Sequence, residues 1–297
     1  MTHLTPRERR EEREFFLFIS PWLFGFLVFT AGPMLASAVL SFAEWDIISP
    51  PKWVGLANYR QLVQDPLFWK SLRVTTTYTL IAVPLHLILS MAVAILLNQK
   101  VKGLGIFRTV FYLPTVLPGV ASLMLWMWIF FPDGLLNAIT ALFGASPRAW
   151  LADEKLALPS LIAMGTWGYG ATMLIFLAGL QEIPQHLYEA AEIDGCGRWS
   201  KFIHITLPML SPVIFFNFVT SMIGTFQVFE AGYIATQGGP NNATLFYLLY
   251  LFRNAFEYFQ MGYACALAWV LFWLIMVLTL LVVRSSAAWV YYEGKKQ

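Results

Sequence analysis

The sequence predicts an all-α membrane protein with about six transmembrane helices. Hydrophobic residues make up 58% of the 297 residues and charged residues only 12%, about half the charged share of a soluble domain. So much apolar surface cannot be hidden inside one water-soluble core of this length, whereas a bilayer accommodates it. Aromatic residues account for 16% of the chain, as expected for lipid-facing helices with interfacial aromatic belts.

Each predicted span is a run of about 20 apolar residues, the length that crosses the hydrocarbon as a helix. The six runs cover residues 15–42, 74–97, 110–131, 156–180, 207–233 and 263–283. The first run is longer than the apolar region of a signal peptide, so we expect it to remain as an uncleaved span. Prolines inside these runs are compatible with helices in a membrane, because neighbouring helices satisfy the freed backbone groups.

The distribution of lysine and arginine predicts the orientation. An even number of spans places both termini on one side, and that side carries more of the basic residues in shorter loops, as cytoplasmic loops do. We therefore expect a cytoplasmic N-terminal segment (1–14), one membrane domain (15–285) and a cytoplasmic tail (286–297). The outward segments are 44–73, 132–155, where we expect an interfacial helix, and 236–261.

Several classes of function receive no support. The net charge of +2 and the absence of a basic run argue against nucleic-acid binding. The two cysteines, Cys196 and Cys265, form neither a disulfide framework nor a metal-ligand spacing. The chain has no HExxH, no paired carboxylates and no Ser/His constellation, so we predict no catalytic residues and no metal site.

The segment from Glu189 to Pro208 differs from an ordinary loop between two spans. Its first part favours a helix, and alanines at 190 and 191 let another surface approach closely. Glycines at 195 and 197 stop that helix and turn the chain. A second short helix, about 198–205, carries Trp199, Phe202 and Ile203 on an apolar side. We predict a helix–turn–helix on the cytoplasmic face that docks in a groove of another protein.

The same segment resembles the EAA motif of the permeases of binding-protein-dependent ABC importers. Every fixed position of that motif is present, namely Glu189, Ala190, Ala191, Gly195, Ile205, Leu207 and Pro208. The resemblance implies a MetI-like fold in which the loop 182–208 seats a coupling helix on an ATPase. Glu189, with Asp194 nearby, would offer a carboxylate to that partner, and Gly195 would make the turn.

The resemblance also implies the partners. The sequence has no GxxxxGK[ST], so ATP and Mg²⁺ are expected on a separate ATPase dimer and no cofactor is expected on this chain. A second homologous permease, an extracytoplasmic binding protein and the lipid bilayer complete the expected environment. The expected location is the inner membrane of a bacterial cell, with several spans and both termini in the cytoplasm.

Two further stretches resemble the carbohydrate-uptake branch, in particular maltose- and glycerol-3-phosphate-type permeases. One covers residues 54–59 and 65–69, and the other covers 236–244, 256–258 and 262–264. Within that branch they are similar to the first of two partner permeases. The resemblance implies that a sugar or oligosaccharide is the cargo and that Gly238, Gly239 and Pro240 face the binding protein.

A polar stripe in the fifth span is the candidate substrate pathway. Asn217, Ser221 and Thr225 recur at helical spacing beside Gly224, and Gln227 follows near the outward end. Hydroxyl-rich sugars suit such groups beside aromatic platforms, which the fourth span offers at Trp167, Gly168 and Tyr169. Polar and small residues also glue helices together in membranes, so pocket and packing stay open as alternatives.

Rival functions remain. An importer of another solute, such as glycerol phosphate, an osmolyte or a peptide, would share the same architecture. A phosphate-bearing ligand would favour a cationic pocket, and no Lys or Arg lies in the middle of a predicted span. An ion-coupled secondary transporter would need a relay of carboxylates within the membrane, for which only Glu230 is a candidate.

Overall fold

The computed structural model describes residues 6–99 and 102–291 of the chain. The expected N-terminal segment up to residue 5 and the expected tail beyond residue 291 therefore lie outside the described residues. The chain divides into two compact units, the first made of residues 1–64 and 251–271 and the second of residues 65–250 and 272–297. The two units are described separately below.

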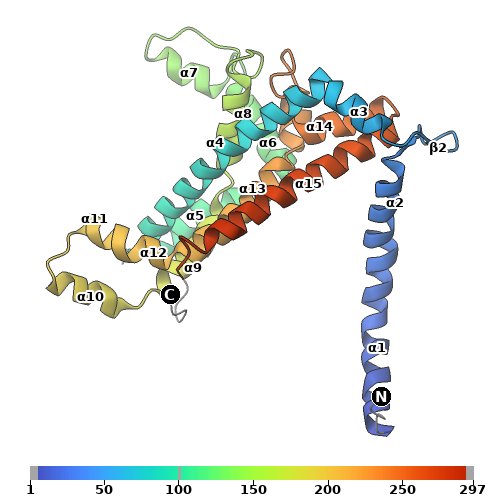
Figure 1. Cartoon of the computed structure of the whole chain (residues 1–297). Helices are drawn as coiled ribbons and strands as arrows, with labels where there is room; N and C mark the ends of the chain where they lie inside the picture. Colours follow the sequence, from blue (N-terminus) through green and yellow to red (C-terminus); the bar gives the residue numbers. More distant parts are fainter. Residues whose placement is uncertain (1–5, 100–101, 292–297) are drawn as a thin grey trace. The chain divides into compact units, whose positions relative to one another are not determined.

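The first unit begins with a long helical run that contains a π-helical turn, and a small antiparallel sheet follows it (Figure 1). In this sheet Ala43 pairs with Trp53 and Glu44 with Lys52. The elements are α1 (Pro6–Phe26), η1 (Leu27–Ala31), α2 (Gly32–Leu40), β1 (Ala43–Glu44), β2 (Lys52–Trp53), α3 (Ala57–Gln64), η4 (Arg253–Glu257) and the first part of α15 (Met261–Ser286).

The second unit is a bundle of helices. Its elements are α4 (Pro66–Leu97), α5 (Leu104–Val116), α6 (Gly119–Phe130), α7 (Leu135–Ala141), α8 (Ala157–Thr166), α9 (Gly170–Glu182), α10 (Gln185–Ile193), α11 (Arg198–Lys201), η2 (Phe202–Thr206), α12 (Leu207–Met209), α13 (Ser211–Phe226), η3 (Ala231–Thr236), most of α14 (Tyr247–Phe252) and the end of α15. Helices α10 and α11 form a hairpin at one end of this unit, and α7 lies at the other (Figure 1).

The predicted all-α membrane fold is confirmed. Five helical runs within the described residues are long and apolar enough to cross a membrane, and a sixth span results if α8 and α9 are counted together. The five runs are Arg10–Leu40, Pro66–Leu97, Gly119–Ala141, Ser211–Thr236 and Met261–Ser286. The helix α4 begins earlier than the expected residue 74, because Asp65 caps it by accepting a hydrogen bond from the Leu67 amide at 2.8 Å.

Three expected spans are interrupted, and in the fifth, expected over 207–233, residues 227–229 separate α13 from η3. The third span, expected over 110–131, is divided into α5 and α6, and Leu117 between them has an extended backbone (φ −67°, ψ 138°). The residue before a proline avoids the helical region, and Pro118 follows Leu117 directly. The fourth span, expected over 156–180, bends by 48° between α8 and α9. The short helix α7 occupies part of the outward segment where a helix was expected.

The core of the second unit forms where α4 packs against both α9 and α13. Small residues allow these helices to approach closely, as is usual in membranes. At Gly179 of α9 an added Cβ would lie 2.8 Å from a methyl group of Val213. The buried residues of this cluster are Val83, Leu87, Ala94, Leu97, Met173, Phe176, Leu177, Leu180, Ile183 and Leu210.

The start of α9 gives a test of this packing. A Cβ at Gly170 would meet the hydroxyl of Thr115 and lie 2.9 Å from the carbonyl oxygen of Phe111 and 3.0 Å from the Cα of Tyr112. Backbone atoms of α5 can move away only if the helix itself shifts. Gly170→Ala should therefore destabilise the protein by about 1–3 kcal/mol. The apparent melting temperature in detergent, followed by intrinsic fluorescence, measures this loss.

The matched control is Gly105→Ala on α5, where nothing lies within 4 Å of an added Cβ. This control should leave the melting temperature unchanged or raise it, since alanine favours a helix. Equal melting temperatures for the two variants would contradict the close contact between α5 and α9.

Candidate functional site: a helical hairpin and a cavity between spans

The predicted helix–turn–helix is present as α10, a tight turn and α11, which continues through η2 into α12. Gly195 adopts a left-handed conformation (φ 75°), and the Cys196 amide donates to the carbonyl of Ala191 at 2.9 Å. This geometry is the usual glycine-dependent end of a helix. Gly197 has φ −71° and is the N-cap residue directly before α11, so at this position the turn does not depend on glycine.

Two side-chain contacts join the arms of the hairpin. The hydroxyl of Tyr188 lies 2.9 Å from that of Thr206, and the ammonium of Lys201 donates to the carboxylate of Glu192 at 2.6 Å. Tyr188 and Glu192 stand one helical turn apart on α10, so the two contacts lie on one face. The hydrogen bond from Lys201 lowers the pKa of Glu192. The ion pair is therefore present at neutral pH and is lost as the pH falls through that lowered pKa.

The motif residues divide into an exposed group and an embedded group. Ala191 and the residues at the end of the motif are half-buried, and Ile205 packs against the core cluster. Glu189 is exposed and accepts a hydrogen bond from the Gln185 amide at 2.9 Å within α10 itself. The exposed group is Glu189, Ala190, Asp194 and Gly195, and the embedded group is Ala191, Ile205, Leu207 and Pro208.

Large apolar side chains protrude from the same hairpin. Ile193 is 87% exposed, Trp199 77% and Ile203 51%, whereas Phe202 is half-buried under Trp199, with the rings edge to face at 6.0 Å. The expected apolar side of the second helix is therefore largely exposed on the surface of the chain and does not pack against the helix bundle. Exposed hydrophobic residues of this size are typical of surfaces that contact another protein.

The last described residues support the point where the hairpin enters α13. The backbone amide of Tyr291 donates to the Ser211 hydroxyl at 2.8 Å, and that hydroxyl donates to the Pro208 carbonyl at 2.6 Å. The ring of Trp289 packs edge to face on Phe215 at 6.0 Å. The expected tail therefore packs, through residue 291, against the base of the hairpin. The sequence contains no pattern that would have predicted this contact.

A cavity of about 200 Å³ lies between α4, α8 and α13. Its wall is mainly apolar but also carries hydroxyl groups, one imidazole and two glycines, so it offers some hydrogen-bonding groups and close backbone approach. The imidazole Nε2 of His86 lies 3.0 Å from the hydroxyl of Thr172. The lining residues are Tyr78, Ala82, Val83, His86, Gly165, Thr166, Ser221, Gly224 and Thr225.

The cavity brings together only part of the predicted pathway. Ser221, Gly224 and Thr225 line it. Asn217 is 2% exposed and bonds the Val213 carbonyl of its own helix at 2.9 Å, so it serves packing. Gln227 is exposed where α13 ends.

The aromatic platform expected in the fourth span lies at the bend and does not line the cavity. Trp167 packs edge to face on Trp126 at 5.6 Å, Tyr169 lies against Phe111 at 6.5 Å, and Gly168 is exposed. Tyr78 also lines the cavity and was not predicted from the sequence. Its spacing of four residues from Ala82 and eight from His86 places the three on one helical face. A Cβ added at Gly165 would collide with the Tyr78 hydroxyl, so the Tyr78 side chain occupies the space that this glycine leaves open.

The expected binding-protein-facing glycines form a compact loop. Gly238 is buried with φ 74°, and its amide donates to the Gly232 carbonyl at 3.0 Å. The hydroxyls of Thr236 and Thr244 lie 2.7 Å apart and close the loop. Gly239 and Pro240 line a cavity of about 550 Å³ that Ala149, Leu151 and Ala152 also border.

Comparison with known proteins decides the family. Residues 86–291 match the family described as "Binding-protein-dependent transport system inner membrane component". The chain belongs to this family. The match begins at His86 and runs through the hairpin to Tyr291, so it covers most of the second unit. This permease is therefore a component of an ABC transporter with several spans in the membrane.

Curated relatives of this permease cover nearly its whole length. The "Probable ABC transporter permease protein YesP" of Bacillus subtilis (strain 168) is 45% identical over 97% of this chain and 95% of the relative. The "Lactose transport system permease protein LacF" of Rhizobium radiobacter is 36% identical, over 89% and 91%. The "Arabinooligosaccharides transport system permease protein AraP" of Bacillus subtilis (strain 168) is 34% identical, over 92% and 88%.

A solved structure shares the fold of the permease. It comes from a bacterial ABC transporter involved in the import of the acidic polysaccharide alginate. The likeness has a TM-score of 0.81 and covers 94% of this chain and 97% of that one, at 22% sequence identity. The predicted MetI-like architecture is thereby confirmed.

The two contacts across the hairpin give a testable prediction. Tyr188→Phe removes one hydrogen bond, worth about 1 kcal/mol, so amide hydrogen exchange over 198–206 should become about fivefold faster. Glu192→Gln should shift exchange in the same direction by breaking the ion pair with Lys201. Exchange followed by mass spectrometry in detergent at neutral pH measures both effects.

Gln185→Ala is the matched control, because the bond from Gln185 to Glu189 lies within α10 and joins no other element. It should leave exchange over 198–206 unchanged. If all three variants exchange at the wild-type rate, the contacts do not hold the arms together.

Proposed function

We propose that this permease is the translocation-pathway subunit of an ATP-driven importer of a sugar or oligosaccharide. An extracytoplasmic binding protein delivers the cargo, a second homologous permease completes the pathway, and an ATPase dimer supplies the energy. The observation that carries the proposal is the hairpin, which combines the EAA spacing with exposed Ile193 and Trp199 at its turn and on its second arm. A surface of this kind suits the groove of a partner protein.

The hairpin would transmit the ATP cycle of the partner, since the sequence carries no phosphate-binding loop of its own. ATP and Mg²⁺ belong to the ATPase dimer in this proposal. The exposed carboxylates of Glu189 and Asp194 would meet basic groups of the ATPase. The permease lies in the bacterial inner membrane with its hairpin and termini in the cytoplasm.

Both the relatives of the permease and the lining of its cavity support a sugar as the cargo. The relatives named above include permeases for lactose and for arabinooligosaccharides. The cavity between α4, α8 and α13 presents Tyr78, Thr166 and Ser221, which suit the hydroxyl groups and apolar faces of a sugar. No lysine or arginine lines this cavity within the described residues, and this favours a neutral ligand over glycerol phosphate.

A secondary transporter finds less support in the geometry. Glu230, the single candidate carboxylate, is exposed at the start of η3 and lies outside the wall of the cavity. A Cβ at Gly119 would come within 2.7 Å of its carboxylate oxygen, so it faces the first turn of α6. A carboxylate at the start of a helix is stabilised by the helix dipole. A structural role therefore accounts for Glu230.

Transport would proceed by alternating access. ATP binding closes the ATPase dimer, and the hairpin moves with it and rocks the spans, so that the cavity opens outward. Hydrolysis then returns the cavity to its inward-open form. The permease performs no covalent chemistry, because the energy enters through the different affinities of nucleotide for the two conformations.

The proposal is tested by reconstituting the permease with its partner permease, ATPase and binding protein in proteoliposomes. We expect a neutral oligosaccharide, among a panel of sugars, glycerol 3-phosphate and glycine betaine, to stimulate ATP hydrolysis.

In Glu189→Lys the same sugar should fail to stimulate hydrolysis, because a positive charge replaces the carboxylate that meets the ATPase. Stimulation by a non-sugar alone would show that the cargo is wrong, and unchanged stimulation in Glu189→Lys would remove the coupling role.

The cavity is tested by filling it. Gly224 lines the cavity and nothing lies within 4 Å of an added Cβ there, so we expect the side chain of Gly224→Leu to occupy part of the cavity. We expect sugar uptake into proteoliposomes to fall by at least about tenfold, because the ligand loses its space. Gly25→Leu is the control, since Gly25 also has nothing within 4 Å and lies in the first span. Equal uptake by the two variants would place the pathway elsewhere.

A further inference from the structure

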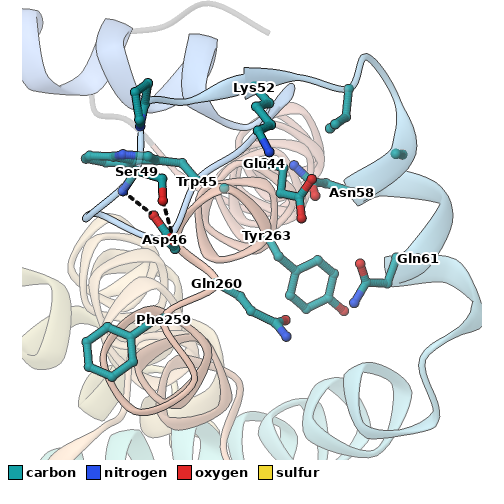
Figure 2. A pocket seen from close by; sticks show the side chains of 14 residues that line it. Glu44, Trp45, Asp46, Ser49, Lys52, Asn58, Gln61, Phe259, Gln260 and Tyr263 are labelled. Carbon is teal, nitrogen blue, oxygen red and sulfur yellow. Dashed lines mark hydrogen bonds between the residues drawn. The ribbon is translucent and has the colours of Figure 1, made fainter.

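The first unit contains a third cavity, of about 450 Å³, that the transport cycle described above does not use. It lies between the turn after α2, the start of α3 and the start of α15 (Figure 2). The volume falls in the range of small-molecule sites, about 300–1,000 Å³. Its wall combines aromatic rings with amide and carboxylate groups, chiefly Glu44, Trp45, Gln61, Phe259, Gln260 and Tyr263.

Hydrogen bonds and one close backbone contact fix the loop and strand residues that form the wall of the cavity. Asp46 accepts hydrogen bonds from the amide of Ser49 at 2.7 Å and from its hydroxyl at 3.0 Å (Figure 2). The buried amide of Asn58 donates to the carbonyls of Ser41 and Ala43, each at 2.9 Å. At Gly262 an added Cβ would collide with the carbonyl of Ala43. Such preorganisation lowers the cost of binding a ligand.

Other polar groups of the wall are free to bind. Within the described residues, the side chains of Glu44, Gln61 and Gln260 make no hydrogen bond. Asp46, in contrast, accepts hydrogen bonds from Ser49. The bond from the Ser49 amide lowers the pKa of Asp46, so this carboxylate stabilises the turn and is less available to a ligand. Figure 2 shows Gln61, Gln260 and Tyr263 pointing into the same space, with Glu44 on the strand side.

A strained residue presents one of the aromatic rings. Phe259 has φ 54° and is 53% exposed at the edge of the cavity. A left-handed conformation is costly for a residue with a ring, and such strain concentrates at ligand sites. The amide of Gln260 donates to the Asn254 carbonyl at 2.8 Å and fixes the turn. The ring therefore stands at the opening instead of folding into the core.

We infer that this cavity is a carbohydrate-binding subsite for a short stretch of a neutral oligosaccharide. Amide and carboxylate groups bond sugar hydroxyls, and the rings of Trp45, Phe259 and Tyr263 suit the apolar faces of sugar rings. The choice of sugar as ligand rests on the proposed function. Under the proposed orientation the subsite lies on the outward side, where it holds the chain as the binding protein releases it.

Other ligand classes fit less well. A metal ion is disfavoured, because no group of three or more His, Cys, Asp or Glu gathers anywhere in the described part of the chain. An anion is disfavoured, because the wall carries two carboxylates, Glu44 and Asp46, against the single ammonium of Lys52. A neutral ligand rich in hydroxyl groups matches the remaining lining.

The test uses the whole transporter in nanodiscs without its binding protein, and the permease carries Gly224→Leu so that the cavity between the spans is filled. Lactose and arabinotriose serve as probes in saturation-transfer NMR titrations. We expect measurable binding that becomes about tenfold weaker when Gln61→Ala and Gln260→Ala are added, because two hydrogen bonds are lost. Both glutamines are exposed, so the added substitutions should not disturb folding.

Gln64→Ala is the control, an exposed glutamine on the same helix that does not line the cavity. It should leave the affinity unchanged. Absence of binding in the Gly224→Leu background, or equal affinity with and without the glutamines, would overturn the subsite even if sugar uptake is normal. Failure of the uptake screen, in contrast, concerns the proposed function.

Discussion

The rest of the second unit depends on one constraint: backbone groups at membrane depth must find hydrogen-bond partners inside the protein. This permease breaks its helices at Leu117–Pro118, at 167–169 and at 227–230, and each break frees backbone groups. The helical segments beside the breaks pack against one another, since α6, α8 and η3 are in mutual contact. Irregular backbone at membrane depth is tolerated where protein or a water-filled cavity surrounds it. Leu117, Gly168 and Gln227 at the breaks are exposed in this chain, as backbone that borders a water-filled cavity would be.

The hairpin shows how one motif serves two purposes. Its exposed residues, among them Glu189 and Asp194, are free to meet another chain, whereas Ile205 and Pro208 join the hairpin to the bundle. A surface that is pushed by a partner can move the spans only if its own arms stay together. The contacts from Tyr188 and Glu192 to the second arm provide that stiffness. In the proposed function, coupling residues and packing residues would therefore share one motif of about twenty positions.

The sequence was sufficient for features that depend on local pattern. Composition predicted the membrane, apolar runs predicted the first, fifth and last spans, and the glycine at 195 predicted the turn between two helices. The break at Leu117 could also have been predicted, because the residue before a proline avoids the helical region. Contacts between distant segments could not be predicted. Nothing local places Tyr78 against Gly165, or Tyr291 against Ser211, because each pair meets only through helix packing.

The polar stripe of the fifth span shows the same limit at a functional site. Helical spacing correctly puts Asn217, Ser221 and Thr225 on one face, yet the neighbours decide what each does. Asn217 is enclosed by packing and bonds its own helix, while Ser221 and Thr225, one and two turns further, open onto a cavity. The cavity exists because α8 contributes glycine and threonine opposite them. Pocket and packing are therefore successive parts of one stripe, with Asn217 buried in the packing and Ser221 and Thr225 lining the cavity.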